Sequence, residues 1–182
     1  MLTTFALIHQ GSTMTEAREL LIDWIRNAHA MEVQSEELLV SQLRRIEHYP
    51  DLRDRLKAHR DETHSQRAIL EDLLHDYRTT PSAWREAGVR LMAFGQNMFQ
   101  VASNDEVVKG AIMLASFERM EMSVYRALAS AAQVAGEDAL VDIFNRLHAQ
   151  EQAMATWHDE HLADLVRQFV VRSELPDVTA RH

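Results

Sequence analysis

Apolar and small residues recur at alternating intervals of three and four positions along four long stretches of this chain. Such spacing gathers them on one face of an α-helix, because a helix completes one turn in about 3.6 residues. The first stretch illustrates the pattern, with Leu21, Ile25, Ala28, Ser35 and Leu39 in one row. We predict four long helices, over residues 15–47, 51–77, 105–134 and 137–172.

Short breaks join these helices in two pairs. Tyr49-Pro50 ends the first helix, and proline is tolerated in the first turn of the second. Ala135-Gly136 supplies a glycine stop between the last two. A longer connection between the pairs contains a shorter apolar helix, over residues 83–102. Because short turns force antiparallel neighbours, the sequence predicts an all-α fold: a ferritin-like antiparallel four-helix bundle with one long crossover containing a short helix.

We expect one domain with loose ends. Residues 1–13 are mildly apolar but lack the basic start of a signal peptide, so we expect a loose N-terminal arm. The bundle is expected over residues 14–172. Residues 173–182, which contain Pro176, are expected to form a loose C-terminal tail.

Composition narrows the range of functions. The chain has 182 residues and a formal net charge of −9, which argues against nucleic acid as a partner. It contains no cysteine, which excludes disulfides, thiolate metal sites and cysteine nucleophiles. No apolar run approaches the ~20 residues of a membrane span, so we expect no membrane partner. A reducing, cytoplasmic location fits these features.

Polar residues interrupt the apolar rows near the middle of all four long helices. Each helix carries at least one glutamate on the face that is expected to be buried. In the second and fourth helices, a histidine stands three residues before the glutamate. The candidate metal ligands are Glu32, His59, Glu62, Glu118, Glu121, His148 and Glu151.

These side chains need compensation inside a bundle, because an isolated ionised carboxylate is very costly to bury. Two divalent metal ions would supply it, and carboxylate oxygens with imidazole nitrogens suit iron or manganese. Di-iron bundles use a Glu from each of two helices and a Glu with a His from each of the others. The alternative is an internal network of the acids with His59, His148 and Arg119, or a wet groove.

The other polar residues near the rows receive simpler interpretations. Tyr125 stands one turn after Glu121, so we expect its hydroxyl to bond a carboxylate. His158 is expected at the edge of the core, and a role beside the metal is its less favoured alternative. Four further histidines are expected on the surface: His29, His64, His75 and His161.

Four segments together resemble a family of ferritin-like bacterial stress proteins, the YciE/YciF group. AHRDETHSQ is similar to the family's HLEET segment, and NAHAMEVQSEELL to its YxAExQL segment. SFERMEMSVYRALASAAQVAG resembles VEHYEIxxYGTLxxLAxxLG in spacing, and LHAQEQAMATW resembles LxEExxxxxxL. The resemblance covers residues 15–167 and implies a four-helix bundle, a homodimer, metal binding and a stress response. It places the family's motif positions on Glu32, His59, Glu62, Glu118, Glu121 and Glu151.

The chain also departs from the family pattern. Arg146 and Ala155 stand where the family often has acids. Met154 follows Glu151 at the place where a ferritin-like ExxH motif would have a histidine. The favoured hypothesis is a protein that binds two iron or manganese ions and reacts with O₂ or peroxide. The alternative is a metal-free helical bundle that acts as a dimeric interaction module, and a storage cage is less favoured.

Overall fold

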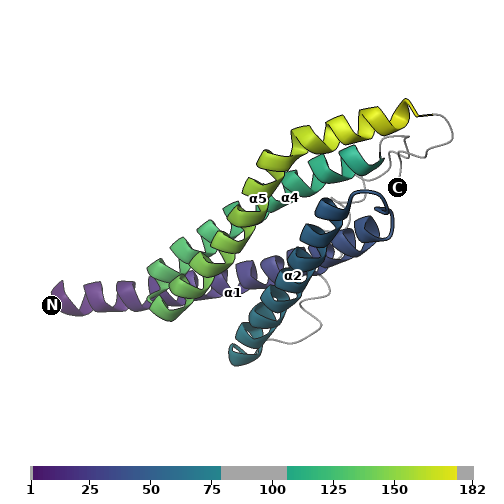
Figure 1. Ribbon diagram of the computed structural model, residues 1–182. Coiled ribbons are helices and arrows are strands. Elements are labelled where there is room, and N and C mark those ends of the chain that lie inside the picture. The colour runs from purple at the N-terminus through teal and green to yellow at the C-terminus, as the bar shows by residue number, and fades with distance from the viewer. Residues whose placement is uncertain (1, 79–105, 176–182) are drawn as a thin grey trace.

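The computed structural model describes residues 2–78 and 106–175, with side chains described over residues 16–78 and 107–175. Long α-helices make up most of these ranges, which confirms the all-α fold, whereas the helix predicted over residues 83–102 lies outside them. No helix among the described residues is long and apolar enough to span a membrane. The four helices are α1 (Leu2–Leu43), α2 (Pro50–Asp76), α4 (Glu106–Ala135) and α5 (Asp138–Ser173) (Figure 1).

The helix boundaries follow the predicted breaks closely except in α1. α1 begins at Leu2, so the predicted start at Thr15 is too late. Pro50 occupies the first turn of α2, after Tyr49 as the N-cap residue. A residue before proline is biased away from the helical conformation, so α1 cannot run directly into α2. The two helices turn back on each other and form the first hairpin.

Gly136 makes the turn of the second hairpin. Its φ of 73° lies in the left-handed region, which residues with a Cβ atom rarely adopt. The amide of Glu137 donates to the carbonyl of Ala132 at 2.9 Å, and that of Gly136 donates to Gln133 at 3.2 Å. These two bonds are those of a Schellman motif, which satisfies carbonyl groups left open at the end of a helix. The predicted glycine stop is therefore confirmed.

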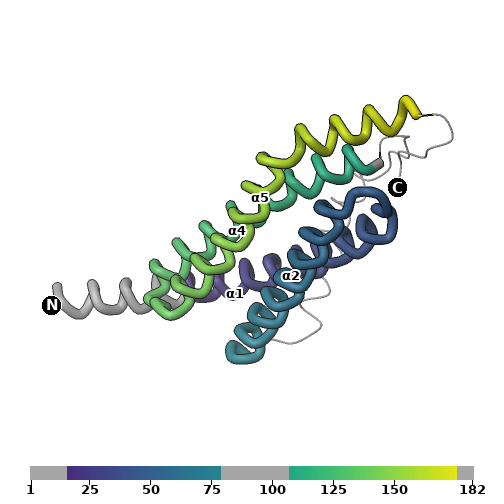
Figure 2. Tube along the Cα trace, viewed as in Figure 1, coloured from purple at the N-terminus to yellow at the C-terminus, as the bar shows by residue number. Residues whose placement is uncertain are grey.

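The two hairpins pack into a bundle in which neighbouring helices contact each other to different extents. α4 and α5 lie side by side along most of their length, and α1 packs against both α2 and α4 (Figures 1 and 2). At Gly110 of α4, an added Cβ atom would lie 2.4 Å from the side-chain nitrogen of Gln42 in α1, so the two helices approach closely there. α2 and α5 contact each other at only a few positions. The α2–α5 edge is thus the least closely packed side of the bundle.

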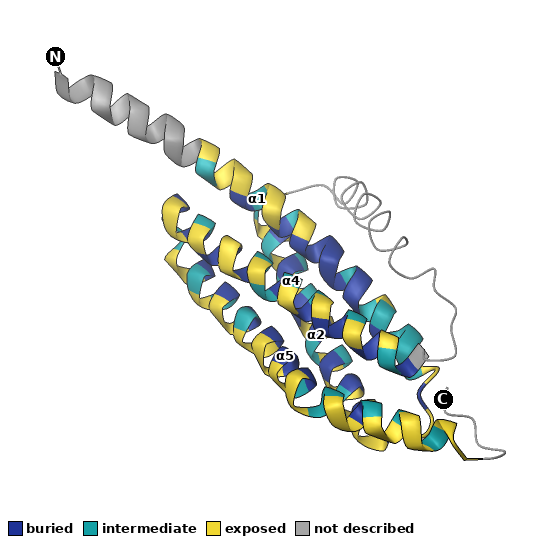
Figure 3. Cartoon of the chain, turned by 90° about the horizontal axis from the view of Figure 1, so that it is seen from above, coloured by how far each residue is buried: buried dark blue, intermediate teal, exposed yellow. Residues whose placement is uncertain are grey.

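Buried side chains face the interior from all four helices (Figure 3). Two apolar clusters fill the two ends of the bundle. One contains Leu21, Ile25, Leu74, Leu128 and Phe144 among others. The second contains Leu39, Ile46, Leu56, Leu114 and Met154 among others. A layer of buried polar side chains separates the clusters, and its acids and histidines are Glu32, His59, Glu118, Glu121, Glu151 and His158.

We predict that Gly136→Ala lowers the free energy of unfolding by about 1–2 kcal/mol, because alanine must adopt a left-handed backbone conformation. Urea denaturation monitored by circular dichroism measures this change. Ser130→Ala is the control, since Ser130 is exposed within α4 and alanine favours the helix. Equal stabilities of Gly136→Ala and the wild type would contradict the assigned turn.

Candidate metal centre

The polar layer is built from one or two residues of each helix. α1 supplies Glu32, α2 supplies His59, α4 supplies Glu118 and Glu121, and α5 supplies Glu151. All five side chains have a relative exposure of 0%. Each stands in line with apolar residues of its own helix, because positions separated by three, four or seven share one face. The apolar rows therefore carry these side chains into the interior.

His59 is oriented by a carboxylate on its own helix. Its Nδ1 lies 3.0 Å from Oε2 of Glu62, one turn away. Glu62 is itself only partly buried and accepts long bonds of 3.4 and 3.5 Å from Arg55. If Nδ1 carries the proton of this bond, Nε2 keeps its lone pair and points into the bundle. A histidine held in this way by a carboxylate is the usual arrangement at protein metal sites.

Nε2 of His59 faces two carboxylates. It lies 2.9 Å from Oε2 of Glu118 and 3.6 Å from Oε2 of Glu151. Even so, Nε2 has no partner in hydrogen-bond geometry among the described residues. One ligand atom from each of His59, Glu118, Glu121 and Glu151 lies within 4.8 Å of all the others. Two ligands on opposite sides of one ion at about 2.1 Å lie about 4.2 Å apart, so small shifts would let all four bind one ion.

Several carboxylate oxygens in this layer are buried and have no hydrogen-bond partner within the described residues. They are both oxygens of Glu118, both oxygens of Glu121, Oε2 of Glu32 and Oε2 of Glu151. Buried polar atoms in folded proteins are nearly always bonded, and an unpaired buried carboxylate destabilises a fold by several kcal/mol, to order of magnitude. Protons or a cation must therefore compensate these oxygens.

The remaining oxygens of the layer are held by neutral groups. The hydroxyl of Tyr125 donates to Oε1 of Glu32, as the sequence predicted. The side-chain amide of Gln66 donates to Oε1 of Glu151 and also to Gln150. These donors fix the two carboxylates without neutralising them, so one oxygen of each stays available to a ligand.

Residues 16–171 match the model of a family described as "Domain of unknown function (DUF892)". The chain belongs to the DUF892 family. It is also similar to a protein from Xanthomonas campestris pv. campestris whose crystal structure is known, with 33% sequence identity and a TM-score of 0.74. That match covers 88% of this chain and 99% of the other. Neither description states an activity, so the function rests on the chemistry of the centre.

The acids of this DUF892 protein differ in their affinity for protons. Burial raises the pKa of Glu32 to about 8, against the opposing effect of the bond from Tyr125. Burial and the neighbouring carboxylates raise the pKa of Glu121 and that of Glu151 well above the usual range. Burial also opposes ionisation of Glu118, but the adjacent His59 outweighs burial and lowers the pKa of Glu118.

A proton on His59 gives this side chain the positive charge that compensates the carboxylate of Glu118. Burial alone would lower the pKa of His59, but the carboxylates of Glu118 and Glu62 outweigh it and raise that pKa to about 10. Without metal, the centre therefore favours a charged His59–Glu118 pair and the protonated forms of Glu32, Glu121 and Glu151. A metal ion would have to displace some of these protons, because ligands bind metal in their deprotonated form.

Three of the predicted ligands, Glu32, Glu62 and His148, are not part of the four-residue cluster. His148 is half-buried, and burial together with Arg126 lowers its pKa. The inward face of α5 runs through Phe144, Leu147 and Glu151, so the position four residues before Glu151 is buried and His148 stands beside that row. Its assignment as a metal ligand stays a prediction. Glu62 contacts Nδ1 of His59 and is not one of the four residues of the cluster.

Two buried histidines depart from their expected places. His29, expected on the surface, is 9% exposed in α1. His158, expected at the core edge, is 2% exposed, and its Nε2 has no hydrogen-bond partner in the described ranges. Burial lowers the pKa of His158 to about 4, although Glu118 acts in the opposite direction. The sequence feature that indicates the burial of His158 is its spacing, since it follows Glu151 by two helical turns on the same face.

We predict that the metal-free protein loses stability as pH rises from 6.5 to 8. Glu32 keeps its proton in the folded state up to a pKa of about 8, whereas the unfolded residue loses it near its ordinary pKa of 4.5. The contribution of a raised pKa is complete below the unfolded pKa and is lost as pH rises through the folded one. The lowered pKa of His158 acts the other way, but only below about pH 6.5.

The free energy of unfolding is expected to fall by at least about 1–2 kcal/mol over this window, since one proton corresponds to about 1.4 kcal/mol per pH unit. Urea denaturation with a chelator at both pH values measures the fall. Glu32→Gln should reduce the fall, while Glu37→Gln, at an exposed position of α1, should leave it unchanged. A wild type whose stability is constant or rises over this window would contradict the protonation of the centre.

Proposed function

We propose that this protein is a ferritin-like di-metal protein that binds two iron or manganese ions between its four helices and reacts with O₂ or peroxide. The observation that carries the proposal is the cluster of His59, Glu118, Glu121 and Glu151. Apart from Oε1 of Glu151, its buried carboxylate oxygens have no hydrogen-bond partner among the described residues. Carboxylate oxygens with one imidazole nitrogen suit iron and manganese, and they suit zinc less exclusively.

The charge of the centre favours two ions over one. Four buried carboxylates carry a charge of −4 when ionised, from Glu32, Glu118, Glu121 and Glu151. Two divalent ions neutralise them fully, while His59 becomes a neutral ligand. With a single ion, two of the four carboxylates would have to keep their protons, so the second ion is the one that lets all four act as ligands. Binding is therefore expected to release protons and to strengthen as pH rises.

The residues have distinct roles in this proposal. Glu118, Glu121, Glu151 and His59 are the ligands of the four-residue cluster, and Glu32 supplies the open Oε2 on the α1 side. Glu62 fixes the ring of His59 through Nδ1, and Tyr125 fixes Glu32. The bound ions would supply one-electron exchange with O₂ or peroxide. The apolar clusters on both sides keep bulk water from the centre.

We further propose the biological setting that the sequence resemblance implies: a YciE/YciF-type stress protein, homodimeric and cytoplasmic. A chain without cysteine suits a reducing compartment. Leu20 and Trp24 are exposed large apolar side chains one turn apart on α1, which suits an interface. Sedimentation velocity on the full chain tests the homodimer, and a monomer at all concentrations contradicts it.

We predict that His59→Ala lowers the affinity for Mn(II) or Fe(II) at least about tenfold, because it removes the nitrogen ligand of the cluster. Isothermal titration calorimetry without oxygen measures affinity and stoichiometry, and about two ions per chain are expected.

His148→Ala is the matched control. It removes a histidine from α5 that stands beside the inward row, so affinity and stoichiometry should equal those of the wild type. Fewer than ~0.2 ions per chain, unchanged by the joint substitution Glu62→Ala and Glu118→Ala, would contradict the proposed function and favour the metal-free interaction module.

A further inference from the structure

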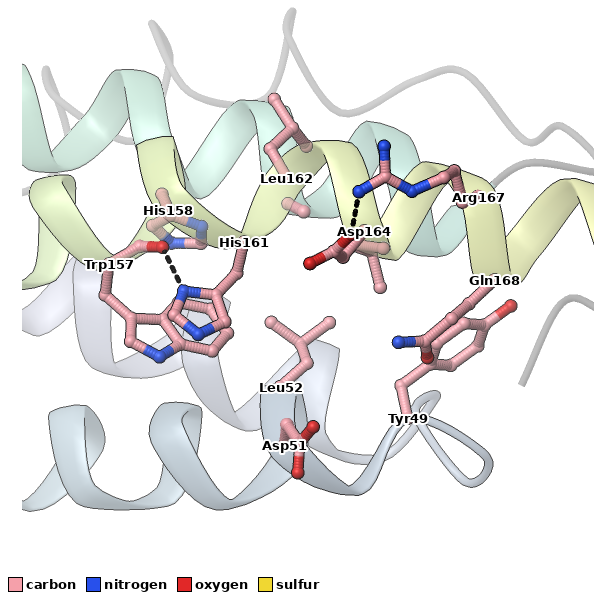
Figure 4. Close-up of a pocket in the computed structure, with 12 residues that line it drawn as sticks. Tyr49, Asp51, Leu52, Trp157, His158, His161, Leu162, Asp164, Arg167 and Gln168 are labelled. Atoms are coloured by element: carbon pink, nitrogen blue, oxygen red, sulfur yellow. Dashed lines mark hydrogen bonds and ion pairs between the residues drawn. The ribbon is translucent and has the colours of Figure 1, made fainter.

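A pocket of about 230 Å³ lies at the open α2–α5 edge of the bundle. Residues at the start of α2, Ala111 of α4 and the second half of α5 line it (Figure 4). Of the residues in the polar layer, His158 also lines this pocket. The pocket therefore occupies the side on which the bundle leaves most room between solvent and the proposed metal centre.

Aromatic and apolar groups form most of the pocket wall. The ring of His161 stacks on Trp157, with centroids 4.3 Å apart and an interplanar angle of 11°. In Figure 4 these rings stand at one end of the pocket and Tyr49 at the other, with Leu52 between them. An engineered apolar cavity of about 150 Å³ holds benzene in another protein, so this volume holds one ring with a substituent.

The charged groups of the wall favour an uncharged occupant over an anion. Two carboxylates, Asp51 and Asp164, and one guanidinium, Arg167, line the pocket. Arg167 donates to Asp164, so this pair is internally neutral. The wall is left with a net negative charge from Asp51, which repels anions and accepts hydrogen bonds.

His158 connects the pocket with the centre. It lines the pocket, is 2% exposed, and its Nε2 has no hydrogen-bond partner in the described part of the chain. Its electrostatic neighbours include Glu118 and His59, which belong to the proposed metal cluster. Figure 4 shows His158 beside the Trp157–His161 stack. His158 and Glu151 also lie two turns apart on the same buried face of α5, so His158 is the part of the pocket wall that α5 connects directly with the cluster.

We propose that this pocket binds small uncharged aromatic molecules that carry a hydrogen-bond donor, of which phenol is the simplest, and presents them to the metal centre through His158. The binding of the aromatic molecule rests on the pocket alone. Its presentation to the metal rests on the proposed function, so separate measurements test the two parts.

The first experiment measures binding in the metal-free protein. In the full chain with Trp24→Phe and Trp84→Phe, Trp157 is the remaining tryptophan. Phenol should quench its fluorescence saturably, with a dissociation constant of about 1 mM or lower. Benzoate, an anion, and cyclohexanol, which lacks the aromatic ring, should bind at least about tenfold more weakly. Quenching that does not saturate, or benzoate or cyclohexanol binding as well as phenol, overturns the pocket assignment.

Two matched variants locate the binding site. Leu162→Tyr adds bulk at a half-buried position of the pocket wall and should weaken phenol binding at least about tenfold. Leu73→Tyr makes the same change at a half-buried leucine of α2 that does not line the pocket, and should leave binding unchanged. Equal effects of both variants would place phenol elsewhere and overturn the assignment.

The second experiment measures communication with the metal. Co(II) replaces the native ion, and its visible absorption should change when phenol saturates the pocket. In His158→Leu, phenol should still quench Trp157, but the Co(II) spectrum should no longer respond. If the Co(II) spectrum of the wild type does not change when phenol binds, the proposed presentation to the metal is overturned. If Co(II) does not bind to the protein, both the proposed function and the presentation of phenol to the metal are contradicted. The fluorescence titration still tests the binding of phenol to the pocket, because it is done without metal.

Discussion

Four glutamate side chains buried at the middle of one bundle set the condition that the rest of this structure must meet. Water does not reach these carboxylates, and the groups that donate hydrogen bonds to Glu32 and Glu151, Tyr125 and Gln66, are neutral. Without metal, a charged His59–Glu118 pair and protons on the other glutamates compensate the layer. Two divalent ions satisfy it with all four acids ionised. The layer is therefore a place where protons and metal ions compete for the same oxygens.

The apolar clusters make this competition possible. Each end of the bundle has its own core, with Leu21 and Phe144 at one end and Leu39 and Leu56 at the other. The burial of these apolar side chains contributes more to the free energy of folding than a few buried polar groups cost. The close α1–α4 contact and the α4–α5 hairpin hold one side of the centre firmly. The open α2–α5 edge, with His59 and His158 beneath it, is the side suited to exchange of small molecules.

Much of the fold and part of the centre could be predicted from the sequence, for a physical reason. A spacing of three and four residues fixes the inward face of a helix, so Glu32, Glu118, Glu121, Glu151 and His59 could be placed in the interior. The same spacing does not decide between the positions three and four residues away. On α5, Leu147 takes the inward place and His148 does not. On α2, Leu74 is fully buried and Leu73 only half-buried. Those choices depend on how neighbouring helices pack.

Other features depend on contacts that no single helix contains. The position of Glu62 behind His59 could not be distinguished from a ligand position by spacing alone, because both lie on the same side of α2. The importance of His158 emerges from its burial and from its place between the pocket and Glu118. The match to the DUF892 family covers residues 16–171, but the family's description gives no chemistry. The function therefore had to come from these spatial relations.

The most direct test is an anomalous-scattering map of crystals grown with Mn(II) or Fe(II). The account predicts two strong peaks about 3.5–4 Å apart among Glu32, His59, Glu118, Glu121 and Glu151, as in two-metal sites generally. Peaks confined to the protein surface, with the interior of the bundle empty of metal at saturating concentration, would contradict it.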